Sequence, residues 1–389
     1  MTFSIILLLT ALLFFIIHLY VFIDIIAGLS RMGLLREKKR SAGEQPKVTV
    51  IVPACNEEKT IGPALQSLLS QDYSNLEIAV VDDRSDDTTG EVVATMQPHS
   101  RHPLRLLRID HLPEDWLGKP HALQKAAEQS EADIFLFTDA DIMMERSSIS
   151  RAVAAMIEDN IDHLSVTFQP LGNNFLLNAM ILDAASGLLA LFKPWKVDNN
   201  KNRYFFGVGA FNMIRAGCYF ECGGHRTIKM HPIDDLMLGK IVKQNGFRQK
   251  CLLGYRMITV HWYNSVPEMV DGLAKNSFSV FHYRPWLAAL SVCFMFLVAA
   301  LPFGGMVLVS GPAFWLFAGT FTLRLTGFAL GAILCRMAPL TLIGAIFAPF
   351  ITLYIVARAA VKTIRNKGIT WRGTFYPLNK LRKSAPLLF

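Results

Sequence analysis

Two aspartates separated by a single residue, Asp139 and Asp141, follow the apolar run IFLFT at residues 134–138. In an extended segment, side chains two positions apart face the same way, so both carboxylates could reach one ligand. Carboxylate oxygens suit Mg²⁺ and Mn²⁺, which also bind phosphate oxygens and water. Acidic pairs in loops are commonly only solvated, but the position after a strongly apolar run favours a DxD motif that binds a metal–diphosphate unit.

A second acidic pair, Asp82 and Asp83, follows another apolar run, EIAVV at residues 77–81. One of these carboxylates could accept a hydrogen bond from the imide N–H of uracil. The alternative is structural, because the polar residues that follow, at 85–88, are good helix N-caps. Both interpretations hold together if the later residues cap a helix while Asp83 binds the base.

A third pair, Asp234 and Asp235, opens a segment with helical periodicity. Acidic side chains are stabilising at a helix N-terminus, so this pair alone does not require a functional role. His231 is close in sequence and could line the same site. Lys119 could offer a positive charge to phosphate groups, although a single lysine is usually a surface residue.

The motifs of several other reaction types are missing from the sequence. It contains neither GxGxxG nor GxxxxGK[ST], which excludes a dinucleotide fingerprint and a P-loop. A serine nucleophile elbow is likewise missing, and the six cysteines include no CxxC pair. The chemistry that remains is a proton-abstracting carboxylate together with a metal ion that neutralises a diphosphate.

The segments around the acidic pairs indicate how the chain would position them. Apolar runs of strand length occur at residues 47–53, 77–81, 104–109 and 134–138, and helical periodicity lies between them, for example at 61–69. Strands that alternate with helices indicate βαβ units and a parallel sheet. Ligands bind beyond the carboxyl ends of such strands, which is where the acidic pairs fall. We therefore expect an α/β, Rossmann-like domain that binds a nucleotide.

The apolar residues, 52% of the chain, are concentrated in two places. Residues 3–29 are almost continuously apolar and long enough to span a bilayer. Five Arg and Lys residues follow between 31 and 40, and the positive-inside rule places this flank in the cytoplasm. A second block, residues 286–361, contains no Asp or Glu and is broken at 311–312 and 336–339, which predicts three hydrophobic segments.

The chain is thus predicted to have four parts. These are a transmembrane anchor at 1–30, a catalytic domain at 47–284, C-terminal membrane segments at 286–361 and a basic juxtamembrane tail at 362–389. The expected location is the bacterial cell (inner) membrane, multi-pass, with a cytoplasmic catalytic domain. Much of the net charge of +8 comes from basic residues beside the membrane segments, where they meet anionic lipid headgroups. We therefore expect the lipid bilayer as a partner and no nucleic acid.

Three C-terminal spans would place the basic tail outside the cell, against the positive-inside rule. One segment is therefore expected to be re-entrant or interfacial. Our candidate is residues 313–334, which carry Arg324 near the middle and several glycines. An arginine inside a membrane usually has a partner or lines a polar cavity.

Six elements in order make the sequence recognisable: VTVIVPACNE, VVDDRSDDT, GKPHAL, FTDAD, GVGAFNMIR…GGH and IDDLMLGKIVKQNGF. Over residues 48–246 the chain resembles the membrane-bound family-2 glycosyltransferases, which have a GT-A nucleotide-binding fold. The spacing from GKP to FTDAD and the closing ITWRGTFYP most resemble the lipid-modifying branch, which includes hopanoid-associated and carotenoid-type enzymes. The resemblance implies a hexosyltransferase that uses a nucleotide-sugar donor, and UDP is favoured over GDP by the resemblance alone.

The resemblance also implies roles for individual residues. Pro53, Asn56 and Glu57 would border the nucleoside, and Asp83 would contact the base. The candidate site residues are, in chain order, Pro53, Asn56, Glu57, Asp82, Asp83, Lys119, Asp139, Asp141, Asp234 and Asp235.

For the reaction itself, the resemblance implies an inverting mechanism. Asp139 and Asp141 would hold Mg²⁺ or Mn²⁺, with Asp141 as the direct ligand. Asp235, preceded by Asp234, would be the general base that deprotonates the acceptor hydroxyl. The metal would stabilise the departing diphosphate, and no covalent sugar–enzyme intermediate is expected.

One departure from the family bears on the acceptor. Many membrane-bound relatives carry a QxxRW motif, whereas the corresponding region here, residues 271–286, reads DGLAKNSFSVFHYRPW. Trp371 and Arg372 in the tail could substitute, but an interfacial Trp beside a lipid-facing Arg is the simpler interpretation. The missing motif and the few membrane segments disfavour a processive polysaccharide synthase and favour a membrane lipid acceptor. The chain could also be a polyprenyl-phosphate glycosyltransferase or a non-catalytic partner in a membrane assembly.

Overall fold

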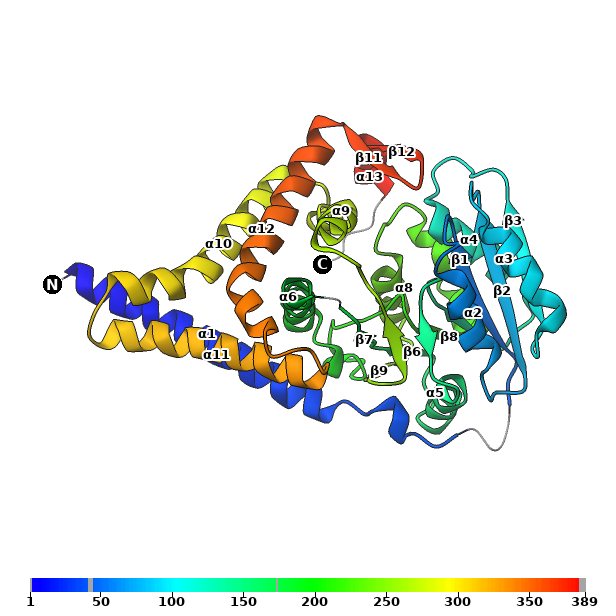
Figure 1. Cartoon of the computed structure of the whole chain (residues 1–389), viewed down its shortest axis with the longest axis horizontal. Helices are drawn as coiled ribbons and strands as arrows, with labels where there is room; N and C mark the ends of the chain where they lie inside the picture. The colour runs from blue at the N-terminus through cyan, green and yellow to red at the C-terminus, as the bar shows by residue number, and fades with distance from the viewer. Residues whose placement is uncertain (1, 41–44, 173, 385–389) are drawn as a thin grey trace. The chain divides into compact units, whose positions relative to one another are not determined.

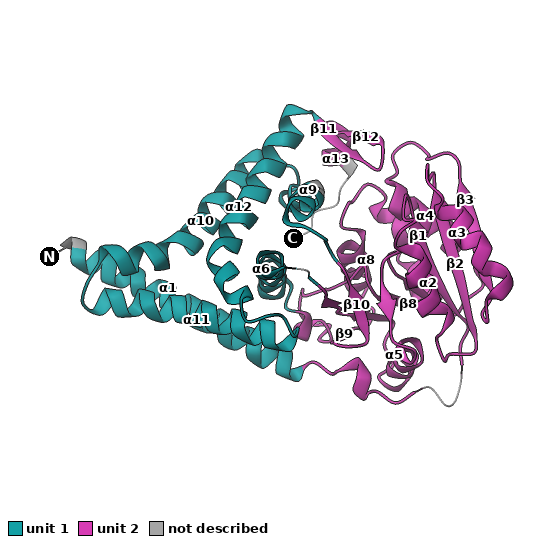
Figure 2. Ribbon diagram, viewed as in Figure 1, with its two compact units in different colours: residues 1–31, 172–193, 262–367 teal, residues 32–171, 194–261, 368–389 magenta. Residues whose placement is uncertain are grey.

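The computed structural model describes residues 2–40, 45–172 and 174–384, and these form two compact units (Figure 2). Unit 1 contains residues 1–31, 172–193 and 262–367, and unit 2 contains residues 32–171, 194–261 and 368–389. Both units are discontinuous in sequence. The predicted catalytic range and the predicted tail are each divided between the two units.

The main sheet of unit 2 has seven strands in the order β3-β2-β1-β4-β8-β6-β9 (Figure 1). Its strands are β1 Val48–Ala54, β2 Leu76–Asp83, β3 Leu104–Ile109, β4 Ile134–Phe137, β6 His163–Val166, β8 Asn212–Arg215 and β9 Gln249–Leu252. The first four are parallel, as the sequence predicts, and their positions confirm the four predicted strands. Strand β8 is antiparallel to both β4 and β6, so the sheet is mixed rather than wholly parallel.

Apolar, largely β-branched strands are buried on both faces because helices connect them. The helices of unit 2 are α2 Ile61–Leu69, α3 Thr89–Met96, α4 Gly118–Glu128, α5 Ser148–Glu158, α7 Ala216–Glu221, α8 Asp234–Gln244 and α13 Leu378–Ser384. Every residue of β1 is buried, and α2 buries Ile61, Leu65 and Leu68 at the predicted helical spacing. The result is a layered α/β core that fixes the carboxyl ends of β1, β2 and β4.

Smaller elements complete unit 2. Strands β5 Met143–Met144, β7 Gln169–Pro170 and β10 Ile258–Val260 form a three-stranded sheet, and β11 Gly368–Trp371 and β12 Thr374–Pro377 form an antiparallel hairpin. The short 3-10 helices of the chain are Leu35–Glu37, Gln97–His99, Pro194–Lys196, Gly224–Ile228 and Ser279–Phe281. The hairpin is a difference from the sequence analysis, which expects only a basic tail after residue 361.

Unit 1 is helical. It contains α1 Thr2–Arg31, α6 Phe175–Phe192, α9 Val266–Ser277, α10 Pro285–Leu308, α11 Pro312–Leu334 and α12 Thr341–Arg365. Among the described residues, five segments are long and apolar enough to cross a membrane: Ser4–Arg31, Phe175–Lys196, Pro285–Leu308, Pro312–Leu334 and Thr341–Arg365. The predicted anchor and the three predicted C-terminal segments correspond to four of these. The segment around α6 is additional, because the sequence analysis includes it in the catalytic range.

Several polar side chains within these apolar helices have partners inside unit 1. Helix α12 packs on α6 and α9, and α1 packs on α11. Lys193 at the end of α6 lies 2.6 Å from Asp24 of α1, and Thr352 donates a hydrogen bond to Asp183. Arg324 donates to the backbone carbonyl of Val298. Polar groups in apolar surroundings pair with one another or with backbone carbonyls in this way, because the surroundings offer them no other partners.

Candidate active site

Two of the acidic pairs lie at the carboxyl ends of strands in the main sheet. Asp82 and Asp83 are the last residues of β2, and Asp139 and Asp141 follow β4. Strand β1 lies between β2 and β4, and its carboxyl end carries Pro53. Asn56 and Glu57 follow it. The seven candidate residues on these three strands and their loops therefore gather at one edge of the sheet.

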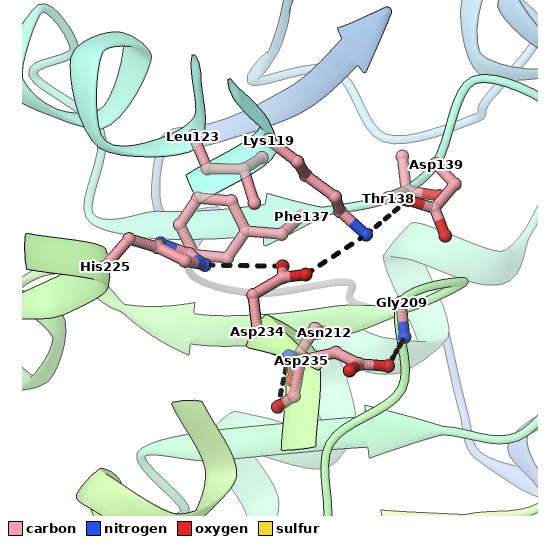
Figure 3. A pocket seen from close by; sticks show the side chains of 10 residues that line it. All are labelled: Lys119, Leu123, Phe137, Thr138, Asp139, Gly209, Asn212, His225, Asp234 and Asp235. Carbon is pink, nitrogen blue, oxygen red and sulfur yellow. Dashed lines mark hydrogen bonds and ion pairs between the residues drawn. The ribbon is translucent and has the colours of Figure 1, made fainter. Parts of the chain in front are cut away.

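A small pocket opens beside β4 (Figure 3). Its lining residues are Lys119, Leu123, Phe137, Thr138, Asp139, Gly209, Asn212, His225, Asp234 and Asp235. Four of the predicted site residues, from α4, the loop after β4 and α8, therefore meet in one place. Asp141 is not among the lining residues.

Lys119 lies between carboxylates of two different elements. Its Nζ is 2.6 Å from Oδ1 of Asp139 and 3.7 Å from Oδ1 of Asp234 (Figure 3). Burial alone would lower the pKa of Lys119, but the surrounding carboxylates outweigh burial and raise its pKa above the usual value. Lys119 is therefore a fixed positive charge, and not a surface residue.

The two aspartates at the start of α8 have different surroundings. Asp234 is 3% exposed, whereas Asp235 is half-buried on the pocket side. The backbone N–H of Gly209 donates to Oδ2 of Asp235 at 2.8 Å, and the N–H of Leu236 donates to Oδ1 at 2.9 Å. Burial raises the pKa of Asp235, although Lys119 opposes this effect. Asp235 is thus an oriented carboxylate whose proton affinity is increased, as a general base requires.

Gly209 allows the loop before β8 to approach both acidic elements. A Cβ at this position would lie 2.7 Å from Oδ2 of Asp139 and 3.4 Å from Oδ2 of Asp235. Any larger residue would push one of these carboxylates aside. A residue with a Cβ could therefore place its N–H here only if the Asp139 carboxylate moved.

His225 forms the inner wall of the pocket. Its Nε2 is 3.8 Å from Oδ2 of Asp234, and its Nδ1 is 2.9 Å from the hydroxyl of Tyr219. Burial, together with the positive charge of Lys119, lowers the pKa of His225 to about 3. The imidazole is therefore neutral at pH 7 and does not balance the charge of Asp234. His231, the other histidine that the sequence suggests, is buried, and its Nδ1 accepts a hydrogen bond from the N–H of Ile233 at 3.4 Å.

Asp83 is fully buried and paired with its neighbour Arg84. Nε of Arg84 donates to Oδ1 at 2.8 Å, and Nη2 donates to Oδ2 at 3.1 Å. The third nitrogen, Nη1, donates to the hydroxyl of Thr374 in the C-terminal hairpin at 3.1 Å. A nucleotide base could reach the Asp83 carboxylate only after these groups had moved. Asp82 is less buried, and its Oδ1 accepts a hydrogen bond from the N–H of Ser85.

Asp141, one of the two predicted metal ligands, has a raised pKa. Burial, reinforced by the charges of Asp139 and Glu57, raises its pKa to about 7. The described residues contain no group of three or more His, Cys, Asp or Glu side chains that could hold a metal ion by themselves. Two carboxylates with unbalanced negative charge do fit a hard divalent cation that completes its shell with phosphate and water oxygens.

Several residues of the site are not predicted from the sequence. Gly209 and His225 lie within the recognisable elements, but no spacing rule links them to the acidic pairs. Arg84 lies in such an element too, and its position directly after two aspartates could have suggested a pairing. Arg372 is 315 positions away from Glu57, yet its Nη2 lies 3.5 Å from Oε1 of that residue.

The chain is similar in sequence and in fold to known proteins. Residues 49–234 match the family described as Glycosyl transferase family 2. The chain is 25% identical over 252 residues to 4,4'-diaponeurosporenoate glycosyltransferase of Staphylococcus haemolyticus (strain JCSC1435), covering 62% of this chain and 63% of the relative. It is 24% identical over 230 residues to the protein of the same name from Staphylococcus aureus (strain USA300), covering 56% of each. The chain thus spans less than two thirds of the length of these relatives.

A solved structure shows the same fold over nearly the whole chain. The mannosyltransferase PcManGT from Pyrobaculum calidifontis, in complex with GDP-Man and Mn²⁺, aligns with a TM-score of 0.58 and 19% identity, covering 93% of this chain and 99% of that chain. The predicted α/β fold of the GT-A type is confirmed, and the names of the two relatives fit the carotenoid-type branch. Residues 49–234 therefore resemble a glycosyltransferase family 2 domain, and the chain has the GT-A fold.

Proposed function

We propose that this protein transfers a sugar, with inversion and with a divalent metal ion, from a nucleotide-sugar donor to a lipid acceptor in the membrane. The observation that carries the proposal is the pocket in which Asp235, Asp139 and Lys119 meet. It combines an oriented carboxylate with a fixed positive charge and with one half of the DxD motif. These are the groups that an inverting transfer needs.

In this mechanism Asp235 accepts the proton of the acceptor hydroxyl as the oxygen attacks the anomeric carbon. The N–H of Gly209 holds the carboxylate in place during the transfer. Asp141, with Asp139 beside it, would hold Mg²⁺ or Mn²⁺, which would neutralise the diphosphate leaving group when bound. Lys119 provides a second positive charge on the Asp139 side of the pocket. Asp234 keeps Lys119 in position from the opposite side.

The nucleoside of the donor would lie over the carboxyl ends of β1 and β2. Pro53, Asn56 and Glu57 border this region in our proposal, and Asp82 and Asp83 form its floor. Because Arg84 occupies both oxygens of Asp83, we propose that Asp83 acts on the base chiefly through Arg84. UDP is our first choice of nucleotide and GDP the alternative.

A lipid acceptor is supported by the names of the two relatives and by the apolar helices of unit 1. The basic residues between 31 and 40 would lie on the cytoplasmic side, together with the whole of unit 2. The catalytic unit would then face cytoplasmic nucleotide sugars while the acceptor stays in the membrane.

Chain connectivity limits which helices can cross the membrane. Helix α6 is preceded by β7 and followed by β8, both in unit 2, so one crossing by α6 would divide unit 2 between two sides. Helices α10 to α12 also leave unit 2 and return to it, so an even number of them crosses. Helices α6 and α12 pack on each other. The most apolar stretch of each of these two helices is 39% buried inside the protein, whereas the corresponding stretches of α1, α10 and α11 are only 6% to 22% buried.

We therefore propose that α1, α10 and α11 span the membrane and that α6 and α12 lie in its interface. The C-terminal segment that does not span the membrane is then α12, and not residues 313–334 as the sequence analysis expects. An epitope inserted after Ala338, between α11 and α12, would be cytoplasmic in our proposal. It would be external if α11 were re-entrant and α12 spanned, so protease protection of the tag in sealed vesicles decides between the two.

The function is tested by turnover with membranes that contain the full chain. Radiolabelled UDP-sugars and GDP-sugars are supplied with Mg²⁺ or Mn²⁺ and a total lipid extract, for the wild type, Asp235→Asn and the exposed control Asp110→Asn. We expect metal-dependent label in an organic-soluble lipid, lost in Asp235→Asn and kept in Asp110→Asn. Label in an insoluble polymer would favour a processive synthase, label on a polyprenyl phosphate would favour that acceptor instead, and no turnover with any donor would contradict the proposal.

A further inference from the structure

The C-terminal hairpin of β11 and β12 brings an arginine to the loop after β1. Nη2 of Arg372, at the tip of the hairpin, lies 3.5 Å from Oε1 of Glu57. The Arg372 side chain is 25% exposed, and that of Glu57 is 27% exposed. Both residues belong to unit 2, so this contact lies within one compact unit. The sequence analysis expects a lipid-facing arginine here, whereas its guanidinium group lies beside a proposed donor-binding residue.

Two arginines of unit 2 contact this region, and their surroundings differ. Arg84 donates to Asp83 and Thr374 at 2.8 to 3.1 Å, so each of its three nitrogens has a partner. Arg372 makes one long contact with Glu57, and its Nη1 is buried without a hydrogen-bond partner among the described residues. A buried N–H group without a partner is unfavourable, so Arg372 can gain a hydrogen bond from a ligand.

The turn itself does not explain an arginine at this position. Arg372 and Gly373 are the two residues between Trp371 and Thr374, and both have positive φ, +46° and +75°. Two-residue turns of this kind favour Asn-Gly or Gly-Gly, because side chains larger than Asn are strained at positive φ. Strained backbone is commonly retained where a side chain has a functional role.

We propose that Arg372 binds the diphosphate of the nucleotide-sugar donor. This inference rests on the proposed function. The planar guanidinium group matches the paired oxygens of phosphate and forms strong charge-assisted hydrogen bonds with them. The diphosphate competes with Glu57 for the same nitrogen and offers more acceptor oxygens than the single 3.5 Å contact. Since Nη1 is shielded from water, the guanidinium group turns as it exchanges Glu57 for phosphate.

The location favours the diphosphate over the base. Glu57 follows β1, which pairs with β4 in the sheet, and the proposed metal ligands Asp139 and Asp141 follow β4. The partner of Arg372 is therefore a neighbour of the proposed metal ligand, where the diphosphate would lie. Arg372 would then add positive charge to this side, while Lys119 supplies it beside Asp139. Without a QxxRW motif in residues 271–286, the hairpin supplies an arginine from a different part of the chain.

The substitution Arg372→Asn separates a ligand-binding role from a structural role. Asparagine suits positive φ better than arginine, so the change removes the guanidinium group while it favours the turn. If Arg372 only supports the hairpin, Arg372→Asn should bind nucleotides as well as the wild type. If Arg372 binds phosphate, the same variant should bind UDP or GDP more weakly. Lys383→Ala is the matched control, because it removes one exposed positive charge from the same C-terminal segment.

The experiment is a titration of the full chain in nanodiscs, with Mn²⁺ present, by UDP, GDP, uridine and guanosine. We expect Arg372→Asn to weaken binding of the preferred nucleoside diphosphate by roughly tenfold or more, with its nucleoside unchanged and Lys383→Ala like the wild type. Arg372→Lys should be intermediate, because it keeps the charge and loses the planar fork. Unchanged diphosphate binding in Arg372→Asn, or equal weakening for diphosphate and nucleoside, would overturn the assignment. A wild type that binds neither UDP nor GDP would instead remove the proposed function, and this inference with it.

Discussion

Two acidic regions lie at the same edge of the main sheet, one after β2 and one around the pocket beside β4, and they differ in how their charge is balanced. At the end of β2, Asp83 is fully buried and has Arg84 on both oxygens. Around the pocket, the carboxylates of Asp139, Asp234 and Asp235 share Lys119, which carries the only full positive charge among the described lining residues.

The contrast indicates which carboxylates are structural and which are available for chemistry. A carboxylate that is already paired with a guanidinium group gains little from a ligand, whereas an unbalanced group attracts cations and protons. Burial raises the pKa of Asp235 and of Asp141, and the negative charge of Asp139 raises both further. The sequence alone presents the pairs at 82–83 and at 139 and 141 as equivalent, because each follows an apolar run.

The largest expected difference between the regions is in turnover. Asp235→Asn removes the proposed base, and we expect kcat to fall by about 10²–10⁴-fold while donor affinity changes little. Asp83→Asn breaks a buried pair instead, which should cost about 3 kcal/mol of stability and change kcat per folded enzyme by less than about tenfold. Steady-state kinetics and thermal unfolding of the two variants check this. Equal losses of kcat in both would show that the two regions do not differ in the proposed way.

The second prediction concerns the close approach of the loop before β8. Gly209→Ala places a Cβ 2.7 Å from Oδ2 of Asp139, so that carboxylate must move. We expect kcat/KM to fall by about 10–100-fold, because small displacements of catalytic groups have effects of this size. Gly217→Ala is the control, since a Cβ there meets no atom within 4 Å. If the two variants had the same kcat/KM, Gly209 would not be needed to position the pocket.

Much of the fold was predictable because local sequence determines it. The runs that form β1, β2 and β4 are mainly apolar and partly β-branched, and the sheet buries nearly all of their residues. The convergence of Lys119 with Asp139 and Asp234 was predictable only in outline. Strand ends indicate a shared edge, but the side chains that touch depend on packing between α4, α8 and the loop before β8.

Other features depend on contacts between distant parts of the chain. Strand β8 is short, and its local sequence does not indicate that it runs antiparallel to β4. Helix α6 was missed because its apolar residues lie within the range assigned to the catalytic domain. The sequence analysis misses the hairpin because it interprets the last residues by their charge alone. In the structure, Arg372 contacts Glu57 and Thr374 contacts Arg84.

The third prediction concerns pH and metal in the unbalanced region. The pKa of Asp141 is about 7 in the folded chain, against 3.8 for an unperturbed Asp, so between these values the folded state binds the additional proton. Without metal, stability should therefore fall as pH rises through this window, by at most about 1.4 kcal/mol per pH unit from this group. Thermal unfolding in EDTA from about pH 4.5 to 7.5 measures the slope.

Two comparisons assign this slope to Asp141. Asp141→Asn should reduce it, whereas Asp110→Asn, an exposed change, should leave it as in the wild type. Mn²⁺ should restore stability at the upper end of the range, because the metal binds the ionised carboxylate. A slope that Asp141→Asn leaves unchanged would exclude this carboxyl group as its source.

The smallest expected effect lies in the balanced region, where Arg84 joins the end of β2 to the hairpin. Thr374→Val removes the hydroxyl that accepts from Nη1 of Arg84 at 3.1 Å and keeps a β-branched side chain for the strand. We expect a loss of about 1 kcal/mol in the free energy of hairpin opening, hence roughly fivefold faster amide exchange across β11 and β12. Thr370→Val makes the same change at an exposed position of the hairpin and should leave exchange unchanged. Faster exchange in both variants would indicate that valine itself loosens the hairpin, whereas a change confined to Thr374→Val would show that Arg84 holds the hairpin and so keeps Arg372 beside Glu57.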